Sequence, residues 1–291
     1  MAAPARERPL VTVVVLCHNY AHFLPESVES ALAQTYEPLE VIVVDDGSTD
    51  DSLAVARRYA DRVRIETQPN MGLERSCNRA VRELVRGDYF CFLSADDAFA
   101  PRYVERLWEA LQRSPDAAYA YCRPLLFGAR EGPMRCLPFS AYFLVKRTNF
   151  VNASALTARA DYLAVGGYAE DLGQHALEDW DFWLRMLARG RRGTYVREPL
   201  LRWRRHDAGS RNPEQGERER AALDHVRARH HELAERMSDV RGRMYYALDF
   251  ALAAADLALG YSRWPRLVRR YERASWRRYR RWHAPDAASR R

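Results

Sequence analysis

The stretch that decides the fold runs from Val11 to Ser52 and reads VTVVVLCHNYAHFLPESVESALAQTYEPLEVIVVDDGSTDDS. It begins with a β-branched apolar run and continues with a segment whose apolar residues recur every three or four positions. A second apolar run follows at Leu39–Val44. A strand, a helix and a second strand of continuous apolar character predict two parallel strands in a sheet that helices cover on both faces.

Three more strand-like runs continue this alternation as far as residue 122. They lie at Arg62–Thr67, Asp88–Leu93 and Ala117–Cys122, and segments with helical spacing separate them. The sequence therefore predicts an α/β domain, with a mainly parallel, Rossmann-like sheet flanked by helices.

The second part of the chain follows a different pattern. Residues 123–151 are irregular and contain Pro and Gly, which predicts loops or a small antiparallel excursion. A strand, a short helix with a Gly166–Gly167 turn and a helix that ends at Gly190 come next, and Arg192–Trp203 fits two more strands. Nearly the whole chain from Glu214 onward has helical spacing, which predicts a helical C-terminal extension.

Composition and charge exclude several classes of protein. Hydrophobic residues make up 47% of the 291 positions, enough to form a buried core. The net charge of +7 is uneven, because residues 262–291 hold eleven arginines and only two acidic residues. The rest of the chain is close to neutral, which argues against a nucleic-acid binder. No stretch free of charged residues is long enough for a membrane span.

The lysine, glycine and cysteine residues exclude further classes of protein. The only lysine is Lys146, outside the alternating region, which excludes a Walker A loop and a receiver-type regulatory domain. No G-x-G-x-x-G follows the first strand, which excludes a dinucleotide-dependent oxidoreductase. Five cysteines without a C-x-x-C pair predict a reduced, cytosolic protein with no disulfide or zinc site.

Two acidic pairs follow predicted strands. Asp45 and Asp46 end the second strand, and Asp96 and Asp97 end the fourth. Ligands of parallel sheets bind at the carboxyl ends of the strands, and a divalent cation there would relieve the repulsion between neighbouring carboxylates. The alternative is a helix cap, in which Ser48 or Asp50 would serve the helix after the first pair.

Four motifs in this order carry a resemblance to a known family: Val11–Ser52, NMGLERSCNRAV from Asn70, GDYFCFLSADD from Gly87 and EDWDFWLRM from Glu178. The sequence resembles family 2 glycosyltransferases of the GT-A fold over about Leu10–Asn212. The resemblance implies an inverting, metal-dependent enzyme that uses a nucleotide-diphosphate sugar. It also implies a catalytic domain at residues 1–212, followed by a helical region with a basic, aromatic tail at 213–291.

The resemblance implies a role for each acidic residue of these motifs. Asp46 would contact the nucleotide base, and Asp96 the ribose. Asp97 would hold Mn²⁺ or Mg²⁺ on the diphosphate, where the cation acts as a Lewis acid. Glu178 and Asp179 would form the catalytic pair, with Asp179 as the general base that activates the acceptor hydroxyl.

The sequence departs from the family's pattern at two places. Ser94 stands where many members have the first Asp of D-A-D-D. Ser76 and Cys77 stand before Asn78 where members often have A-R-N. Arg75, just before this motif, would replace the missing cation beside the nucleotide, with Asn78 as its neighbour.

Other candidate residues have two interpretations. His206, in LRWRRHDAGSRN, matches the region where a family histidine completes the metal site, but it also fits a surface position. Trp180 and Trp183 fit sugar stacking, although their helical spacing favours core packing. The Glu178–Asp179 pair would also stabilise the first turn of a helix. The Gly166–Gly167 turn fits either the edge of the acceptor pocket or a helix C-cap.

The expected partners follow from the resemblance. They are a UDP-, GDP- or dTDP-sugar donor and a glycan or lipid-linked acceptor, in bacterial polysaccharide, glycolipid or glycoconjugate synthesis. The expected location is cytoplasmic, including the cytoplasmic face of the inner membrane. The alternative is a non-catalytic module of the same fold that binds nucleotide sugars without turnover.

The basic tail also has two interpretations. Its predicted helix carries an aromatic stripe at steps of three and four, formed by Trp264, Val268, Tyr271, Ser275, Tyr279 and Trp282. Such a helix suits the surface of an anionic membrane, with its arginines near the headgroups. In the other interpretation, which we favour slightly, the stripe packs on the catalytic domain.

Overall fold

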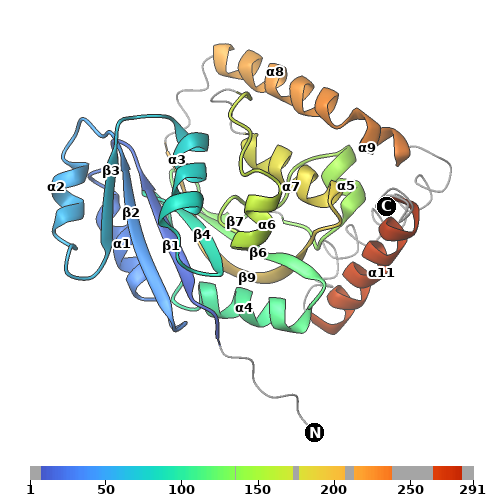
Figure 1. The fold of residues 1–291 in the computed structure, drawn as a ribbon, viewed down its shortest axis with the longest axis horizontal. Coiled ribbons are helices and arrows are strands. Elements are labelled where there is room, and N and C mark those ends of the chain that lie inside the picture. Colours follow the sequence, from blue (N-terminus) through green and yellow to red (C-terminus); the bar gives the residue numbers. More distant parts are fainter. Residues whose placement is uncertain (1–7, 135, 173–176, 207–212, 238–264, 284–291) are drawn as a thin grey trace, which may run out of the picture.

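The computed structural model describes residues 8–134, 136–172, 177–206, 213–237 and 265–283. One mixed sheet runs through these residues, with helices on both of its faces (Figure 1). Its strands are β1 (Val11–Cys17), β2 (Leu39–Asp46), β3 (Arg64–Gln68), β4 (Tyr89–Ser94), β5 (Ala98–Phe99), β6 (Ala117–Gly128), β7 (Gly132–Pro133), β8 (Leu156–Ala158) and β9 (Arg192–Arg205).

The strand order places the first strands side by side. The order is β3-β2-β1-β4-β8-β6-β9-β5, with β7 paired to β6. Strands β1 to β4 are parallel to their neighbours within that group, and β6 is parallel to β9. Strand β8 joins the two groups and is antiparallel to both β4 and β6. The mainly parallel sheet predicted from the sequence is confirmed, and β8 is its antiparallel link.

Helices cover the sheet and extend beyond it. They are α1 (Leu24–Leu32), α2 (Ser52–Arg57), α3 (Leu73–Arg79), the π-helical turn η1 (Ala80–Leu84), α4 (Tyr103–Arg113), α5 (Ala141–Lys146), α6 (Arg159–Ala164), α7 (Glu178–Ala188), α8 (Pro213–Arg229), α9 (His231–Arg236) and α11 (Pro265–His283). Helices α8 and α9 run along one side of the molecule, and α11 lies near α5 (Figure 1). None of these helices is long and apolar enough to cross a membrane.

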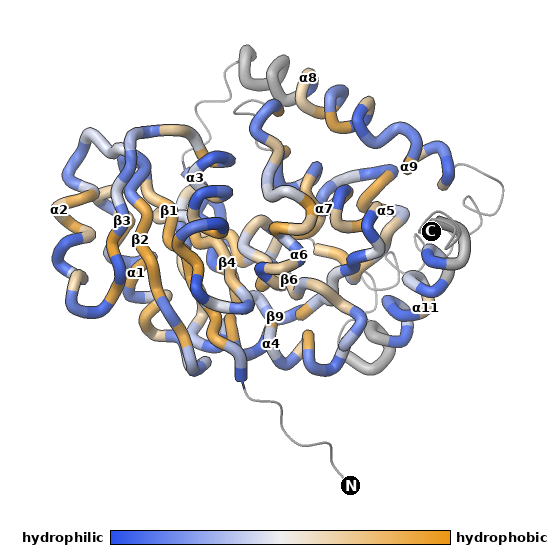
Figure 2. The backbone as a smooth tube through the Cα atoms, in the orientation of Figure 1, coloured by the Kyte–Doolittle hydropathy of each residue, from blue (hydrophilic) through white to orange (hydrophobic). Residues whose placement is uncertain are grey.

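The core has two parts, one on each face of the sheet. Alternate residues of β1 separate between them: Val13 and Val15 pack with α1 and α4, while Val14 packs with α3 and α7. This separation follows from the period of two in a strand. The continuously apolar β1, β2 and β4 therefore supply both parts, and they form the orange centre of Figure 2.

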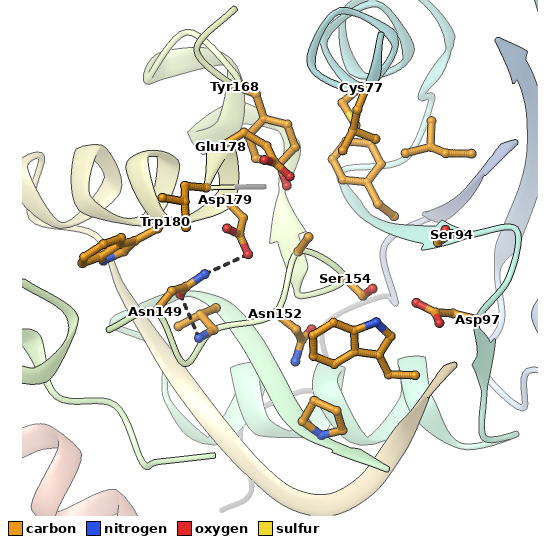
Figure 3. A pocket seen from close by; sticks show the side chains of 18 of the residues that line it. Cys77, Ser94, Asp97, Asn149, Asn152, Ser154, Tyr168, Glu178, Asp179 and Trp180 are labelled. Atoms are coloured by element: carbon orange, nitrogen blue, oxygen red, sulfur yellow. Dashed lines mark hydrogen bonds between the residues drawn. The ribbon is translucent and has the colours of Figure 1, made fainter. Parts of the chain in front are cut away.

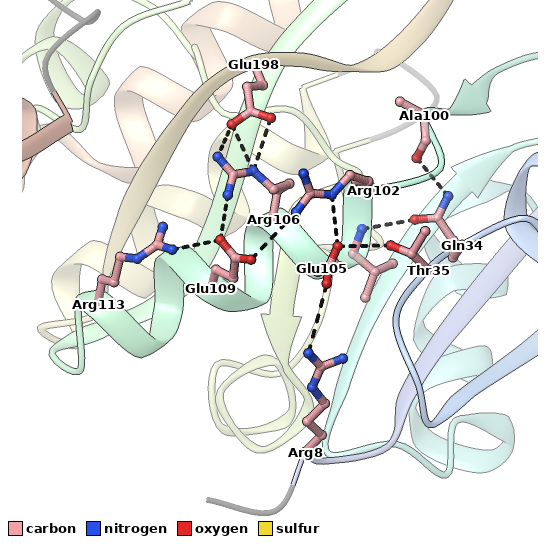
Figure 4. A network of polar contacts seen from close by, with 11 residues as sticks. Arg8, Gln34, Thr35, Ala100, Arg102, Glu105, Arg106, Glu109, Arg113 and Glu198 are labelled. Atoms are coloured by element: carbon pink, nitrogen blue, oxygen red, sulfur yellow. Dashed lines mark hydrogen bonds and ion pairs between the residues drawn. The ribbon is translucent and has the colours of Figure 1, made fainter. Parts of the chain in front are cut away.

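Charged residues brace α4 against its neighbours (Figure 4). The guanidinium of Arg106 contacts Glu198 of β9 and donates to Glu109 at 2.6 Å. Glu105 Oε2 accepts hydrogen bonds from Arg102 Nε and from the Thr35 hydroxyl, each at 3.0 Å. Exposed ion pairs of this kind contribute about 0–1 kcal/mol each, so the network sets the position of α4 more than it stabilises the fold.

Two expectations need correction. Arg192–Trp203 forms one long strand, because β9 stays paired with β6 across a register shift between Cys122 and Pro124. Residues 123–151 contain the small antiparallel excursion that was one of the two alternatives, because β7 pairs with β6, but they also contain the helix α5, which was not expected. The helical structure expected between residues 238 and 264 lies outside the described residues.

The C-terminal helix α11 packs against α5 and β9. Trp276 and Tyr279 are buried, and the Trp276 ring lies 6.3 Å from that of Phe139. The packing interpretation of the aromatic stripe is thus met at Ser275 and Tyr279, while the buried Trp276 lies outside the predicted stripe. Arg273 and Arg277 remain exposed on the outer face, where contact with a membrane stays a prediction.

Candidate active site

A cavity of about 1150 Å³ opens at the carboxyl ends of β1, β2 and β4. One side is lined by the ends of these strands, including Asp46 and Asp97. The opposite side is lined by the start of α7, with Glu178 and Asp179, and by the loop before β8. Figure 3 shows Asp97 and Asp179 facing each other across the open space. The cavity thus has a strand end and a helix end.

Asp46 is buried at the end of β2 and receives several hydrogen bonds. Its Oδ1 accepts from Gln68 Nε2 at 2.7 Å and from the Met71 amide at 3.1 Å, and its Oδ2 accepts from the Gly72 amide at 3.2 Å. These donors fix the carboxylate in one orientation beside the cavity. A separate carboxylate lies at the start of α2, where Asp50 Oδ1 accepts from the Ser52 amide at 2.9 Å.

Asp96 and Asp97 have different surroundings. Asp97 is buried in the cavity wall, and its Oδ1 accepts from the Arg204 amide at 2.8 Å. Burial, then the neighbouring Asp96, raises the pKa of Asp97 to about 8. Asp96 hydrogen-bonds to Ser94, and its Oδ2 lies 2.9 Å from His206 Nε2. The two carboxylates and the histidine therefore meet at one edge of the sheet.

These residues fit a sparse site for a divalent cation. Burial is the main cause of the raised pKa of Asp97, and a cation bound beside it would stabilise its charged form. Carboxylate oxygens suit Mg²⁺ and Mn²⁺. No group of three or more His, Cys, Asp or Glu residues in the described chain forms a complete site. Oxygens of a bound ligand would have to complete the coordination.

The helix end of the cavity centres on Asp179, in the first turn of α7. Its Oδ2 accepts from Asn149 Nδ2 at 2.8 Å, and Asn149 Oδ1 in turn accepts from the Val151 amide at 3.0 Å (Figure 3). Burial, then the charge of Glu178, raises the pKa of Asp179 well above its usual value. Burial also raises the pKa of Glu178. Raised pKa values are typical of carboxylates that exchange protons in catalysis.

The remaining residues of α7 are structural. Asp181 is fully buried. Its Oδ2 accepts from Arg185 Nε at 2.7 Å, and its Oδ1 lies 2.9 Å from His230 Nε2. Trp183 packs against Tyr119, with 4.3 Å between ring centroids, as core packing predicted. Trp180 is also buried and donates to Leu144 O at 2.7 Å, although it forms part of the cavity wall.

Three predicted nucleotide-binding residues, Asp96, Asn78 and Arg75, lie outside the cavity lining, and so does the predicted metal residue His206. Asn78 is buried, and its side chain bonds to Tyr162, to both backbone groups of Tyr168 and to Glu170. Arg75 is exposed and pairs with Glu170 at 3.3 Å. Their contact with a nucleotide stays a prediction.

The backbone conformation and the contact with Asn78 explain why glycines occupy positions 166 and 167. Gly166 and Gly167 have φ of 89° and 76°, and their amides bond back to the last turn of α6. A side chain on Gly167 would meet Asn78 Oδ1 at 2.1 Å. The turn is therefore a helix C-cap, and it leads directly to Tyr168, which lines the cavity.

Two residues at the site were missed from the sequence. His18, just after β1, lines the cavity and lies 2.9 Å from the Asp46 carbonyl. Its position at the carboxyl end of a strand was a usable signal. Asn149 had none, because a single asparagine in an irregular segment does not show which carboxylate it will meet.

Comparison with known proteins agrees with this geometry. A model of the family described as Glycosyl transferase family 2 matches residues 12–160. EpsE of Bacillus subtilis, named as a glycosyltransferase, is 31% identical over 207 residues that cover 67% of this chain and 73% of EpsE. The chain belongs to glycosyltransferase family 2. Chondroitin synthase of Escherichia coli is 38% identical over 123 residues, which cover 41% of this chain but only 18% of that protein.

Solved structures share the fold of this family 2 glycosyltransferase. Staphylococcus aureus TarS, in complex with UDP-GlcNAc, matches with a TM-score of 0.61 and 15% identity, covering 75% of this chain and 65% of TarS. The mannosyltransferase PcManGT of Pyrobaculum calidifontis, in complex with GDP-Man and Mn²⁺, matches with a TM-score of 0.55 and 19% identity. That match covers 97% of this chain and 89% of PcManGT. Both support the GT-A fold.

Proposed function

We propose that this glycosyltransferase moves a sugar from a nucleotide-diphosphate sugar to an acceptor hydroxyl, with inversion at the anomeric carbon. The observation that carries the proposal is the cavity with carboxylates at two opposite ends (Figure 3). A single displacement needs the leaving group on one face of the sugar and a base on the other. The strand end and the helix end supply these two positions.

At the strand end we assign the donor. Asp46 would contact the nucleotide base and Asp96 the ribose. Asp97, with His206 nearby, would hold Mn²⁺ or Mg²⁺. When bound, the cation neutralises the charge that develops on the departing diphosphate. Complexes of TarS with UDP-GlcNAc and of PcManGT with GDP-Man and Mn²⁺ support a donor and cation of this kind.

At the helix end we assign proton transfer. Asp179 would accept the proton of the acceptor hydroxyl as that oxygen attacks the anomeric carbon. The raised pKa means that the Asp179 carboxylate has a higher proton affinity than an ordinary aspartate, which makes it a stronger general base. Asn149 would orient it through the hydrogen bond to Oδ2. Glu178 would assist by raising the proton affinity of its neighbour.

The proposal extends to the biological setting of the enzyme. We place the enzyme in bacterial polysaccharide, glycolipid or glycoconjugate synthesis, in the cytoplasm or at the cytoplasmic face of the inner membrane. The similarity to chondroitin synthase supports a glycan acceptor. A lipid-linked acceptor would agree with membrane contact through the exposed arginines of α11.

The test begins with a screen of UDP-, GDP- and dTDP-sugars by thermal shift, with and without Mn²⁺. A ligand that binds only the folded protein raises its melting temperature. We expect one nucleotide class to do so, more strongly with Mn²⁺, and the enzyme to hydrolyse that donor slowly when no acceptor is present. If no donor binds, the proposal fails. Tight binding without hydrolysis or transfer would instead support a non-catalytic binding module.

A further inference from the structure

The helix end of the cavity contains two arginines that the proposed chemistry does not use. Arg147 follows α5, and Arg227 lies on α8. Both line the cavity and both are exposed to solvent. Arginine and lysine are otherwise absent from the described residues that line it. This positive charge lies at the end that also holds Glu178 and Asp179, whereas the cation site is at the strand end.

Helix α8 is fixed in the position that brings Arg227 into the cavity. Arg229 and His230 both contact the buried Asp181 of α7, at 3.5 and 2.9 Å, and Arg229 also contacts Asp171. Asp181 is two residues after Asp179, so α8 is held directly against the helix of the proposed base. Leu223, one turn before Arg227, lines the cavity as well.

The position of Arg147 is fixed to the same helix. Trp180 of α7 donates to the Leu144 carbonyl of α5, and Asn149 donates to Asp179. Arg147 lies between these two contacts in the sequence. Both arginines therefore belong to segments that are tied to α7 by hydrogen bonds, which sets the position of their backbone relative to the proposed base.

We propose that the acceptor of this enzyme carries a phosphate or carboxylate group, which Arg147 and Arg227 bind while its hydroxyl reaches Asp179. This inference rests on the proposed function. Guanidinium groups bind both anions in a forked geometry. The carboxylates of Glu178 and Asp179 would repel an anionic acceptor, and the two arginines offset that repulsion. Leu177 and Leu223 add a partly exposed apolar surface for the rest of the acceptor.

The test uses small anionic probes and their neutral partners with the full-length protein. Glucose 1-phosphate and glucuronate are compared with methyl glucoside by calorimetry, in EDTA so that no cation draws phosphate to Asp97. We expect the anionic probes to bind more tightly than methyl glucoside. Arg147→Gln and Arg227→Gln should each weaken anion binding by roughly 10- to 150-fold, the range for one charge-assisted hydrogen bond. Equal binding of charged and neutral probes overturns the inference.

A matched control lies on the same helix. Arg220 is exposed on α8 and outside the cavity lining, so Arg220→Gln removes the same charge without touching the site. We expect unchanged anion binding in this variant. A loss as large as that in Arg227→Gln would mean that only the overall charge matters, and the inference would be wrong. Farnesyl phosphate compared with farnesol then separates lipid-linked from saccharide acceptors, depending on whether the lipid adds affinity.

Failure of this inference is separable from failure of the proposed function. Donor binding with Mn²⁺ is measured in the same three variants, and all of them should retain it because the arginines lie at the other end of the cavity. Normal donor binding and hydrolysis together with no preference for anions would reject only the anionic acceptor. Absence of any donor binding in the unmodified protein would reject the proposed function itself.

Discussion

The two ends of the cavity are built in different ways. At the strand end, Asp46 and Asp97 sit on neighbouring parts of one sheet and accept backbone amides, from Met71 and Gly72 and from Arg204. At the helix end, Asp179 is held by the side chain of Asn149. The carboxylates of the strand end thus accept mainly backbone amides, with Gln68 adding a side-chain bond to Asp46, while Asp179 at the helix end accepts from a side chain.

This difference has a functional consequence. A backbone-bound site tolerates substitutions in its surroundings, because the sheet fixes its donors. The geometry of a site that side chains on separate helices hold together changes when any of those side chains is substituted. We therefore expect donor binding to be robust and acceptor use to be sensitive to substitutions around α5, α7, α8 and α11. Four predictions test this division, beginning with the largest effect.

The first prediction concerns the proposed base. Asp179→Asn keeps the size of the side chain but cannot accept a proton, so transfer should fall by ~10² to 10⁴. Donor binding, measured by calorimetry with Mn²⁺, should stay within a factor of about two of the unmodified protein. Near-normal turnover would move the role to Glu178, and Glu178→Gln made in parallel would show it. Lost donor binding would mean that the two ends are not separate.

The second prediction concerns the cation. Asp97→Asn should remove the part of donor affinity that depends on Mn²⁺. Removing a residue that only hydrogen-bonds to a metal ligand lowers metal affinity about 10- to 100-fold in such sites. Loss of the ligand itself should therefore lower Mn²⁺-dependent donor affinity at least about tenfold. Asp51→Asn, at the exposed start of α2, is the matched control and should change nothing. Unaltered Mn²⁺-dependent binding in Asp97→Asn would reject the cation site.

The third prediction concerns the support of the base. The hydrogen bond from Asn149 lowers the pKa of Asp179, so Asn149→Ala should raise it further. The acid limb of the pH–rate profile should then move to higher pH, since more of the base is protonated at a given pH. Turnover near neutral pH should drop roughly fivefold, the scale of one hydrogen bond. An acid limb that stays in place would show that Asn149 does not act on Asp179.

The fourth prediction concerns the anchor of α11. Glu272 is fully buried, and its oxygens accept from the Phe139 and Tyr195 amides and from the Thr194 hydroxyl, at 3.0 to 3.2 Å. Burial raises its pKa to about 7. Because the folded state then holds a proton that the unfolded state releases above its ordinary pKa, this group stabilises the fold below that pKa. Its contribution is lost as the pH rises toward 7.

The variant Glu272→Gln should therefore reduce the fall in melting temperature between pH 5 and pH 7.5. Both backbone bonds go to one oxygen, Oε1, which glutamine keeps, and the Thr194 hydroxyl can accept from the new amide. Glu272→Ala should instead destabilise the protein by about 3 kcal/mol or more, since three buried donors lose their acceptor. A pH dependence identical in the unmodified protein and Glu272→Gln would contradict this account.

The sequence predicted the strand end well and the helix end only in part. The sheet, the positions of Asp46, Asp96 and Asp97 and the start of α7 follow from local patterns, because strand ends and helix starts have compositional signals. The partners of Asp179 and Asp181 do not. Asn149 comes from an irregular segment, and the helical spacing around His230 does not show which residue it will contact, so both contacts arise only when segments distant in sequence pack together.

The C-terminal helix shows the same limit. The stripe predicted from the spacing of this helix includes Tyr279, which is buried. The spacing does not single out Glu272, the one acidic residue of the helix, as its buried anchor. An isolated glutamate among arginines is an available signal, since it interrupts an otherwise uniform charge. Its three acceptor contacts could not be predicted, because they join α11 to β9 and to the loop before α5.

The central claim is a single displacement between the two ends of the cavity, with the diphosphate leaving at Asp97 and the base at Asp179. The configuration of the first product tests it most directly. Once the thermal-shift screen has identified a donor, proton NMR of the product, recorded early in the reaction, gives the anomeric configuration of the transferred sugar. We predict the configuration opposite to that of the donor. A product that retains the donor's configuration would contradict the account, because retention requires a second displacement or a front-face route that this arrangement does not provide.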